Sequence, residues 1–134
     1  MVVDAAGLTP AIRRALDDGI EALSLELTPA QVDALCAYLG LLLRWNKAYN
    51  LTAVREPVAM VQRHLLDSLA VLPLFTKRGP RVIDVGTGAG LPGAVLAIAI
   101  PDQQFDQHDS NGQKCRVQFQ VKTELGVANI AVRH

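Results

Sequence analysis

The chain has 134 residues, about half of them apolar, and its 13 basic residues balance its 13 acidic ones. This length suits one globular domain with its own core. The apolar runs are too short for a transmembrane span, and the first residues lack the order of a secretory signal. Cys36 and Cys115 are the only cysteines and have no CxxC partner. We therefore expect reduced core thiols, no metal site and a cytoplasmic location.

Charge is distributed unevenly along the chain. Residues 36–81 contain seven basic and two acidic side chains, whereas residues 1–35 contain two basic and six acidic ones. Because local positive potential attracts phosphate, the middle segment is the candidate nucleic-acid face. On charge alone, a solvated helix surface is the preferred alternative.

Helices are predicted throughout the first part of the chain. A Thr-Pro pair at residues 9–10, and again at 28–29, places a capping Thr before a Pro at the first helical position. Apolar residues at helical spacing predict a helix over about 29–48 and another after Pro57. We expect residues 1–78 to form an N-terminal helical cap.

The pattern changes at residue 81, where short β-branched runs begin to alternate with helical stretches. Strands are predicted at 82–85, about 104–108 and about 129–132, with helices over 92–100 and about 111–125. This alternation predicts a parallel sheet of the Rossmann-like kind. We expect residues 79–134 to be the first half of such a domain.

The segment after the first strand carries the functional signal. It reads Val82-Ile83-Asp84-Val85-Gly86-Thr87-Gly88-Ala89-Gly90-Leu91-Pro92-Gly93. Alternate glycines allow a ligand to lie against the backbone, and the next helix begins with free N–H groups. Residues 88–93 also match GxGxxG, so a dinucleotide oxidoreductase is an alternative, as is a purely structural turn.

Asp84 favours a methyltransferase over an oxidoreductase, whereas Asp109, about 20 residues after the glycines, fits a ribose-binding acid in either enzyme. Asp84 lies within the apolar strand, where a buried acid is costly unless it has a function. In methyltransferases that function is to hold the amino-acid end of S-adenosylmethionine. Asp109 follows the second strand and would accept hydrogen bonds from the ribose hydroxyls. Its alternative role is to cap the 111–125 helix, which Ser110 or Asn111 could also do.

Three ordered blocks resemble a known family: residues 43–55 (LRWNKAYNLTAVR), residues 63–69 (RHLLDSL) and the glycine segment. Together they resemble glucose-inhibited division protein B, from about residue 30 onward. The resemblance implies a class I methyltransferase sheet with an N-terminal helical cap. It also implies methyl transfer from S-adenosylmethionine to N7 of a guanine in the 16S rRNA of the small ribosomal subunit.

The site residues follow from the motif and this resemblance, which puts Gly86 and Leu91 on the cofactor and Asp109 on its ribose. The expected cofactor-binding residues are Asp84, Gly86, Thr87, Gly88, Gly90, Leu91, Asp109 and Ser110. Lys47, Arg63 and His64 are expected near RNA or the pocket edge, although His64 could simply be a packed histidine. Guanine N7 has a lone pair and no proton, so alignment suffices and no catalytic residue is expected.

Two features depart from the family pattern. The family continues beyond the third strand, so the chain is expected to be C-terminally truncated, with an open sheet edge that favours self-association. Residues 103–120 are also unusually polar, with Gln107 and His108 at positions where a buried strand is usually apolar. A non-catalytic remnant that binds RNA and cofactor is therefore the alternative function.

Overall fold

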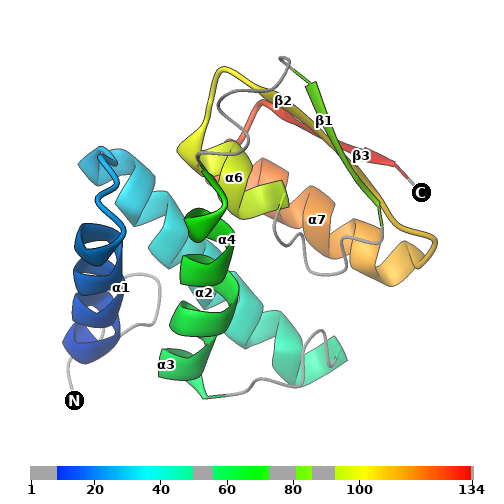
Figure 1. The fold of residues 1–134 in the computed structure, drawn as a ribbon. Helices are drawn as coiled ribbons and strands as arrows, with labels where there is room; N and C mark the ends of the chain where they lie inside the picture. Colours follow the sequence, from blue (N-terminus) through cyan, green and yellow to red (C-terminus); the bar gives the residue numbers. More distant parts are fainter. Residues whose placement is uncertain (1–8, 50–55, 73–80, 86–92, 134) are drawn as a thin grey trace.

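The computed structural model describes residues 9–49, 56–72, 81–85 and 93–133. The helical part contains α1 (Pro10–Ala22), α2 (Pro29–Tyr49), α3 (Pro57–Met60), the π-helix η1 (Val61–Leu66) and α4 (Asp67–Ala70). The second part alternates β1 (Arg81–Val85), α6 (Gly93–Ala99), β2 (Gln104–His108), α7 (Gly112–Leu125) and β3 (Ile130–Arg133). Figure 1 shows the helical part beside the sheet, with α6 and α7 between them.

Local capping explains where the first two helices begin. Thr9 caps α1, its Oγ1 atom accepting a hydrogen bond from the Ile12 amide at 3.4 Å. At the start of α2, the Thr28 amide donates to Gln31 Oε1 (2.8 Å) and the Gln31 amide donates to Thr28 Oγ1 (3.2 Å). This reciprocal pair is a capping box. Both predicted helix starts are confirmed.

The three strands of the described residues form a parallel sheet in the order β1-β2-β3, as the alternation of strands and helices predicted. Val82 pairs in register with Phe105, which pairs with Ile130. The helices α6 and α7 pack on one side of this sheet (Figure 1). Among the described strands, β1 and β3 are the edges.

The end of α7 also follows from a local signal. Gly126 has a φ of 63°, a left-handed conformation that glycine adopts without steric cost. The Val127 amide donates to the Lys122 carbonyl at 3.1 Å, which makes the turn a Schellman motif. The expected stop at Gly126 is therefore confirmed.

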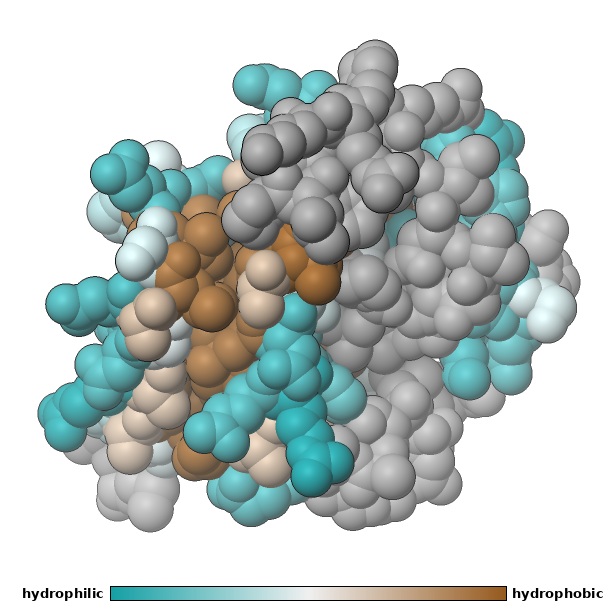
Figure 2. Space-filling view, in the orientation of Figure 1, coloured by the Kyte–Doolittle hydropathy of each residue, from teal (hydrophilic) through white to brown (hydrophobic). Residues whose placement is uncertain are grey.

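A continuous hydrophobic core joins the helices to the sheet. It runs from Leu16 of α1 through Leu39 of α2 and Leu69 of α4 to Phe105 and Ile130 of the sheet, all nearly or fully inaccessible to solvent. Figure 2 shows further apolar residues over the junction between α1 and the α3–η1–α4 segment, bordered by hydrophilic side chains. Folding of the helical part and the sheet is therefore coupled by shared apolar burial.

The π-helix η1 departs from the ordinary helix expected after Pro57. The Asp67 amide donates to the carbonyl of Gln62, five residues earlier, which is the π-helical bond. Val61 and Leu65 remain buried at a helical spacing. Apolar spacing alone therefore could not reveal the wider turn.

The unusual polar residues of β2 differ in their environments. Gln107 is fully buried, whereas His108 is only partly buried. Cys36 and Cys115 are both buried and neither forms a disulfide, as expected. The polar sequence of β2 therefore does not prevent the strand from occupying the central position of the described sheet.

Candidate functional site

The carboxyl ends of β1 and β2 lie side by side. Val85, the last residue of β1, pairs in register with His108, the last residue of β2. The chain therefore leaves β1 into residue 86 and leaves β2 into Asp109, and both strands end at the same carboxyl edge of the sheet, that is, the edge formed by their C-terminal ends. Ligands of open parallel sheets bind outside this edge.

Most of the predicted cofactor-binding segment lies outside the described residues. This applies to Gly86, Thr87, Gly88, Gly90 and Leu91. The backbone of Asp84 belongs to β1 and pairs in register with Gln107, but its side chain also lies outside the description. The geometry of this edge is therefore best defined at Asp109.

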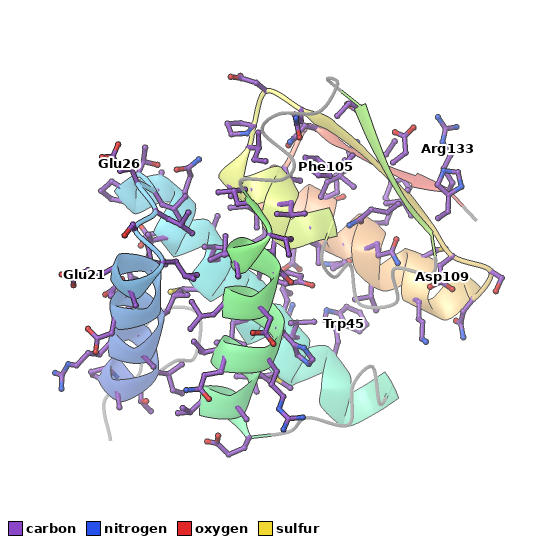
Figure 3. The ribbon with its side chains drawn as sticks, in the orientation of Figure 1. Glu21, Glu26, Trp45, Phe105, Asp109 and Arg133 are labelled. Atoms are coloured by element: carbon purple, nitrogen blue, oxygen red, sulfur yellow. The ribbon has the colours of Figure 1, made fainter. Side chains whose placement is uncertain are left out.

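Asp109 is held firmly at the end of β2. Its amide donates to the carbonyl of Arg133, at the end of β3, over 3.1 Å. Its Oδ1 atom accepts a hydrogen bond from the Asn111 amide at 2.8 Å. Figure 3 shows Asp109 beside the start of α7, and its side chain is partly exposed. A carboxylate is thus fixed at the sheet edge within reach of solvent.

Asn111 is the residue that caps α7. Its Oδ1 atom accepts a hydrogen bond from the Lys114 amide at 3.1 Å, the contact expected of an N-cap side chain. The competing role of Asp109, as the helix cap, is therefore filled by Asn111. Ser110 is exposed between them.

Cys115 joins this turn from inside α7, a contact that sequence reasoning missed. Its Sγ atom lies 3.3 Å from the Asp109 carbonyl oxygen and 3.7 Å from that of Arg133. Burial raises the pKa of the Cys115 thiol and the negative charge of Asp109 raises it further, whereas the hydrogen bond with the Asp109 backbone lowers it by less. The only sequence signal was the position of Cys115 in the first turns of a helix that follows a candidate ligand residue.

The predicted RNA-contacting residues lie in the helical part. Arg63 is exposed and His64 partly buried on η1, which packs against α1. Burial lowers the pKa of His64, against the smaller opposing effects of a hydrogen bond with the Arg63 backbone and the Asp67 charge. Lys47 lies in α2, and its side chain is outside the described residues.

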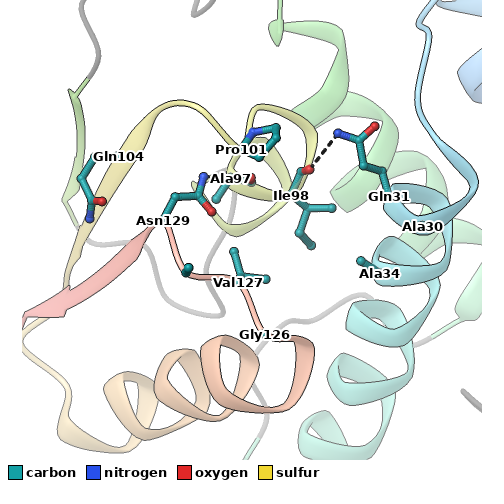
Figure 4. Close-up of a pocket in the computed structure, with 11 residues that line it drawn as sticks. Ala30, Gln31, Ala34, Ala97, Ile98, Pro101, Gln104, Gly126, Val127 and Asn129 are labelled. Carbon is teal, nitrogen blue, oxygen red and sulfur yellow. Dashed lines mark hydrogen bonds between the residues drawn. The ribbon is translucent and has the colours of Figure 1, made fainter.

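A groove of about 490 Å³ lies at the opposite, amino edge of the sheet (Figure 4). It is lined by Ala30, Gln31, Ala34, Ala97, Ile98, Pro101, Gln104, Gly126, Val127, Ala128 and Asn129. Gln31 donates to the carbonyls of Ile98 and Ala99, both at 3.3 Å. Asn129 donates to the carbonyls of Ala97 (3.0 Å), Ile100 (3.1 Å) and Gln103 (2.8 Å). These amides therefore serve the end of α6.

The described ranges are residues 9–49, 56–72, 81–85 and 93–133. No helix within them is long and apolar enough to cross a membrane. Nor do these ranges contain a cluster of three or more His, Cys, Asp or Glu side chains that could hold a metal ion.

Comparison with known proteins gives a consistent result. The chain is 55% identical to the ribosomal RNA small subunit methyltransferase G of Ectopseudomonas mendocina over 116 residues, 87% of this chain and 54% of that protein. It is 52% identical to the Pseudomonas syringae pv. syringae protein of that name over 127 residues, 95% of this chain and 58% of the relative. The identity to the Chromohalobacter salexigens protein of that name is 51% over 123 residues, which are 92% of this chain and 58% of the relative.

The chain thus spans a little more than half the length of these curated relatives. A family model described as rRNA small subunit methyltransferase G, or GidB, matches residues 31–134. The match includes all three strands and the carboxyl edge at which Asp109 lies. The chain therefore belongs to the rRNA small subunit methyltransferase G family.

Proposed function

We propose that the chain provides the S-adenosylmethionine-binding part of a class I methyltransferase acting on 16S rRNA. In this proposal, residues 79–134 are the first half of a Rossmann-like methyltransferase domain and residues 1–78 are its helical cap. The placement of Asp109 carries the proposal. It is a partly exposed carboxylate at the carboxyl end of β2, next to the strand that leads into the glycine segment.

The chemistry of these residues fits a nucleoside ligand. A carboxylate accepts hydrogen bonds and suits the two hydroxyls of a ribose. Asn111 caps α7, so Asp109 is not required for that role. We assign ribose binding to Asp109, with Ser110 beside it, and the amino-acid end of the cofactor to Asp84. The rest of the cofactor would lie along Gly86, Thr87, Gly88, Gly90 and Leu91.

The proposed reaction requires little from protein side chains. S-adenosylmethionine, when bound, supplies a methyl group on a positively charged sulfur. Held by Asp84, the glycine segment and Asp109, it would supply this methyl group to the lone pair of guanine N7. No proton is removed in this step, and the contribution of the chain is alignment of the two reactants. We assign Lys47, Arg63 and His64 to contacts with the RNA.

Calorimetric titration tests the cofactor assignment. The chain should bind S-adenosylhomocysteine saturably and should not bind NAD, the ligand expected of an oxidoreductase. Asp109→Asn should weaken binding by roughly tenfold or more, because hydrogen bonds to a charged acceptor contribute about 1.5–3 kcal/mol. Asp102→Asn is the matched control, since Asp102 is exposed in the turn before β2, at the opposite edge.

Each outcome has a clear meaning for the proposal. Binding of NAD alone would assign the glycine segment to an oxidoreductase. Failure of a folded sample to bind either ligand would contradict the cofactor assignment. Binding of S-adenosylhomocysteine without transfer of labelled methyl groups to small-subunit RNA would favour a binding module over an enzyme.

A further inference from the structure

Asp109, in the turn between β2 and α7, is held by contacts with three residues, of which only Asn111 belongs to the turn. The Asp109 amide is fixed by Arg133 of β3, and its carboxylate oxygen accepts from the Asn111 amide. The remaining backbone group, the Asp109 carbonyl, receives the Cys115 thiol at 3.3 Å. Both backbone polar groups of Asp109 therefore have partners outside the turn itself.

The position of Cys115 explains how its side chain reaches this carbonyl. It is the fourth residue of α7, which begins at Gly112. Helical side chains are inclined toward the helix N-terminus, so the thiol extends back over the turn. Cys115 is 8% exposed. Its raised pKa keeps the thiol protonated near neutral pH, and therefore able to donate.

We propose that Cys115 is a positioning residue for Asp109: its thiol holds the Asp109 carbonyl and so fixes the direction in which the carboxylate faces a ribose. This inference rests on the proposed function, because it assigns a supporting residue to that same site. The thiol has a single hydrogen, and the shorter distance favours the Asp109 carbonyl over that of Arg133. Cys115 itself would not touch the ligand.

Two substitutions separate hydrogen bonding from packing. Cys115→Ser keeps a donor at the same place, whereas Cys115→Val has a similar size and no donor. Cys36→Val is the matched control, because Cys36 is also a buried cysteine but lies in α2, outside this turn. The ligands are S-adenosylhomocysteine and an analogue whose ribose lacks both hydroxyls.

Calorimetry of the whole chain should then give a ligand-specific pattern. Cys115→Val should weaken binding of S-adenosylhomocysteine about threefold, less than the equivalent of one ordinary hydrogen bond because a thiol is a weak donor, and leave binding of the analogue unchanged. Cys115→Ser and Cys36→Val should stay within about twofold of the wild type for both ligands. Unchanged binding in Cys115→Val, or an equal loss for both ligands, would overturn the proposal.

Amide hydrogen exchange of the ligand-free chain separately tests the tether, by which we mean the hydrogen bond from the Cys115 thiol to the Asp109 carbonyl. The Asp109 and Asn111 amides should exchange faster in Cys115→Val than in the wild type and Cys115→Ser. Unchanged exchange would overturn the tether even if the wild type binds S-adenosylhomocysteine. If the wild type does not bind this ligand, faster exchange in Cys115→Val would still support the tether. The ribose role and the proposed function would then both be refuted.

Discussion

Asn129 allows the sharpest test of how the fold is held together. Its Nδ2 group donates to the carbonyls of Ala97, Ile100 and Gln103 at 2.8–3.1 Å. A helix leaves its last carbonyls without intrahelical partners, and Asn129 serves those at the end of α6 from a position about 30 residues further along the chain. Its side chain has two hydrogens, so it forms the equivalent of two ordinary hydrogen bonds.

The expected cost of removing this amide follows from those contacts. Two hydrogen bonds at about 1 kcal/mol each, and the partly buried carbonyls left behind, make Asn129→Ala destabilising by about 2–3 kcal/mol. Asn129→Asp should cost more, because a carboxylate has no hydrogen to donate and would face three carbonyl oxygens. Either loss is a large part of the roughly 5–15 kcal/mol that stabilises a typical domain.

The same substitution at Asn111 is the control. Asn111 accepts a hydrogen bond from the Lys114 amide at the start of α7, where aspartate is an equally good cap and its charge suits the helix dipole. Asn111→Asp should therefore change the free energy of unfolding by less than about 0.5 kcal/mol or stabilise the chain. Urea denaturation followed by circular dichroism measures both variants. Equal stability of Asn129→Asp and Asn111→Asp would refute the reasoning.

Two further predictions concern the helical part. A Cβ atom on Gly19 would lie 2.3 Å from Leu66 Cδ1, so Gly19→Ala should destabilise the chain by about 1 kcal/mol. In a Leu66→Ala background the clash is absent. There the same substitution should stabilise the chain by up to about 1 kcal/mol, because alanine favours helix more than glycine does. Denaturation of the four proteins of this cycle tests it, and the same sign in both backgrounds would contradict it. Burial lowers the pKa of His64 in the folded state below its ordinary value of 6.5. As the pH falls, His64 is therefore protonated first in the unfolded state, and stability should fall as the pH drops below about 6.5. His64→Gln should reduce this loss in thermal unfolding between pH 7 and 5, and an identical pH dependence would count against a partly buried, neutral His64.

The candidate site was predictable in outline because its signals are local. The glycine segment after the first strand and Asp109 after the second are separated by one strand–helix–strand unit, and parallel pairing brings the two strand ends together. The supporting contact from Cys115 was not predictable. A buried cysteine in an amphipathic helix is ordinarily a small apolar residue, and only the packing of α7 on the turn gives its thiol a carbonyl partner.

The sequence by itself determined the helix starts at Thr9 and Thr28, the helix stop at Gly126 and the alternation of strands and helices. These signals act over a few residues. Thr9 and Thr28 each accept a hydrogen bond from the amide three residues further along the chain, and Gly126 adopts a positive φ. The tertiary structure decided which carbonyls Gln31 and Asn129 would serve. Gln31 reaches Ile98 across 67 residues, and no local pattern specifies such a pair. The side chains of Gln31 and Asn129 reach these carbonyls only after apolar burial has brought α2, α6 and β3 together.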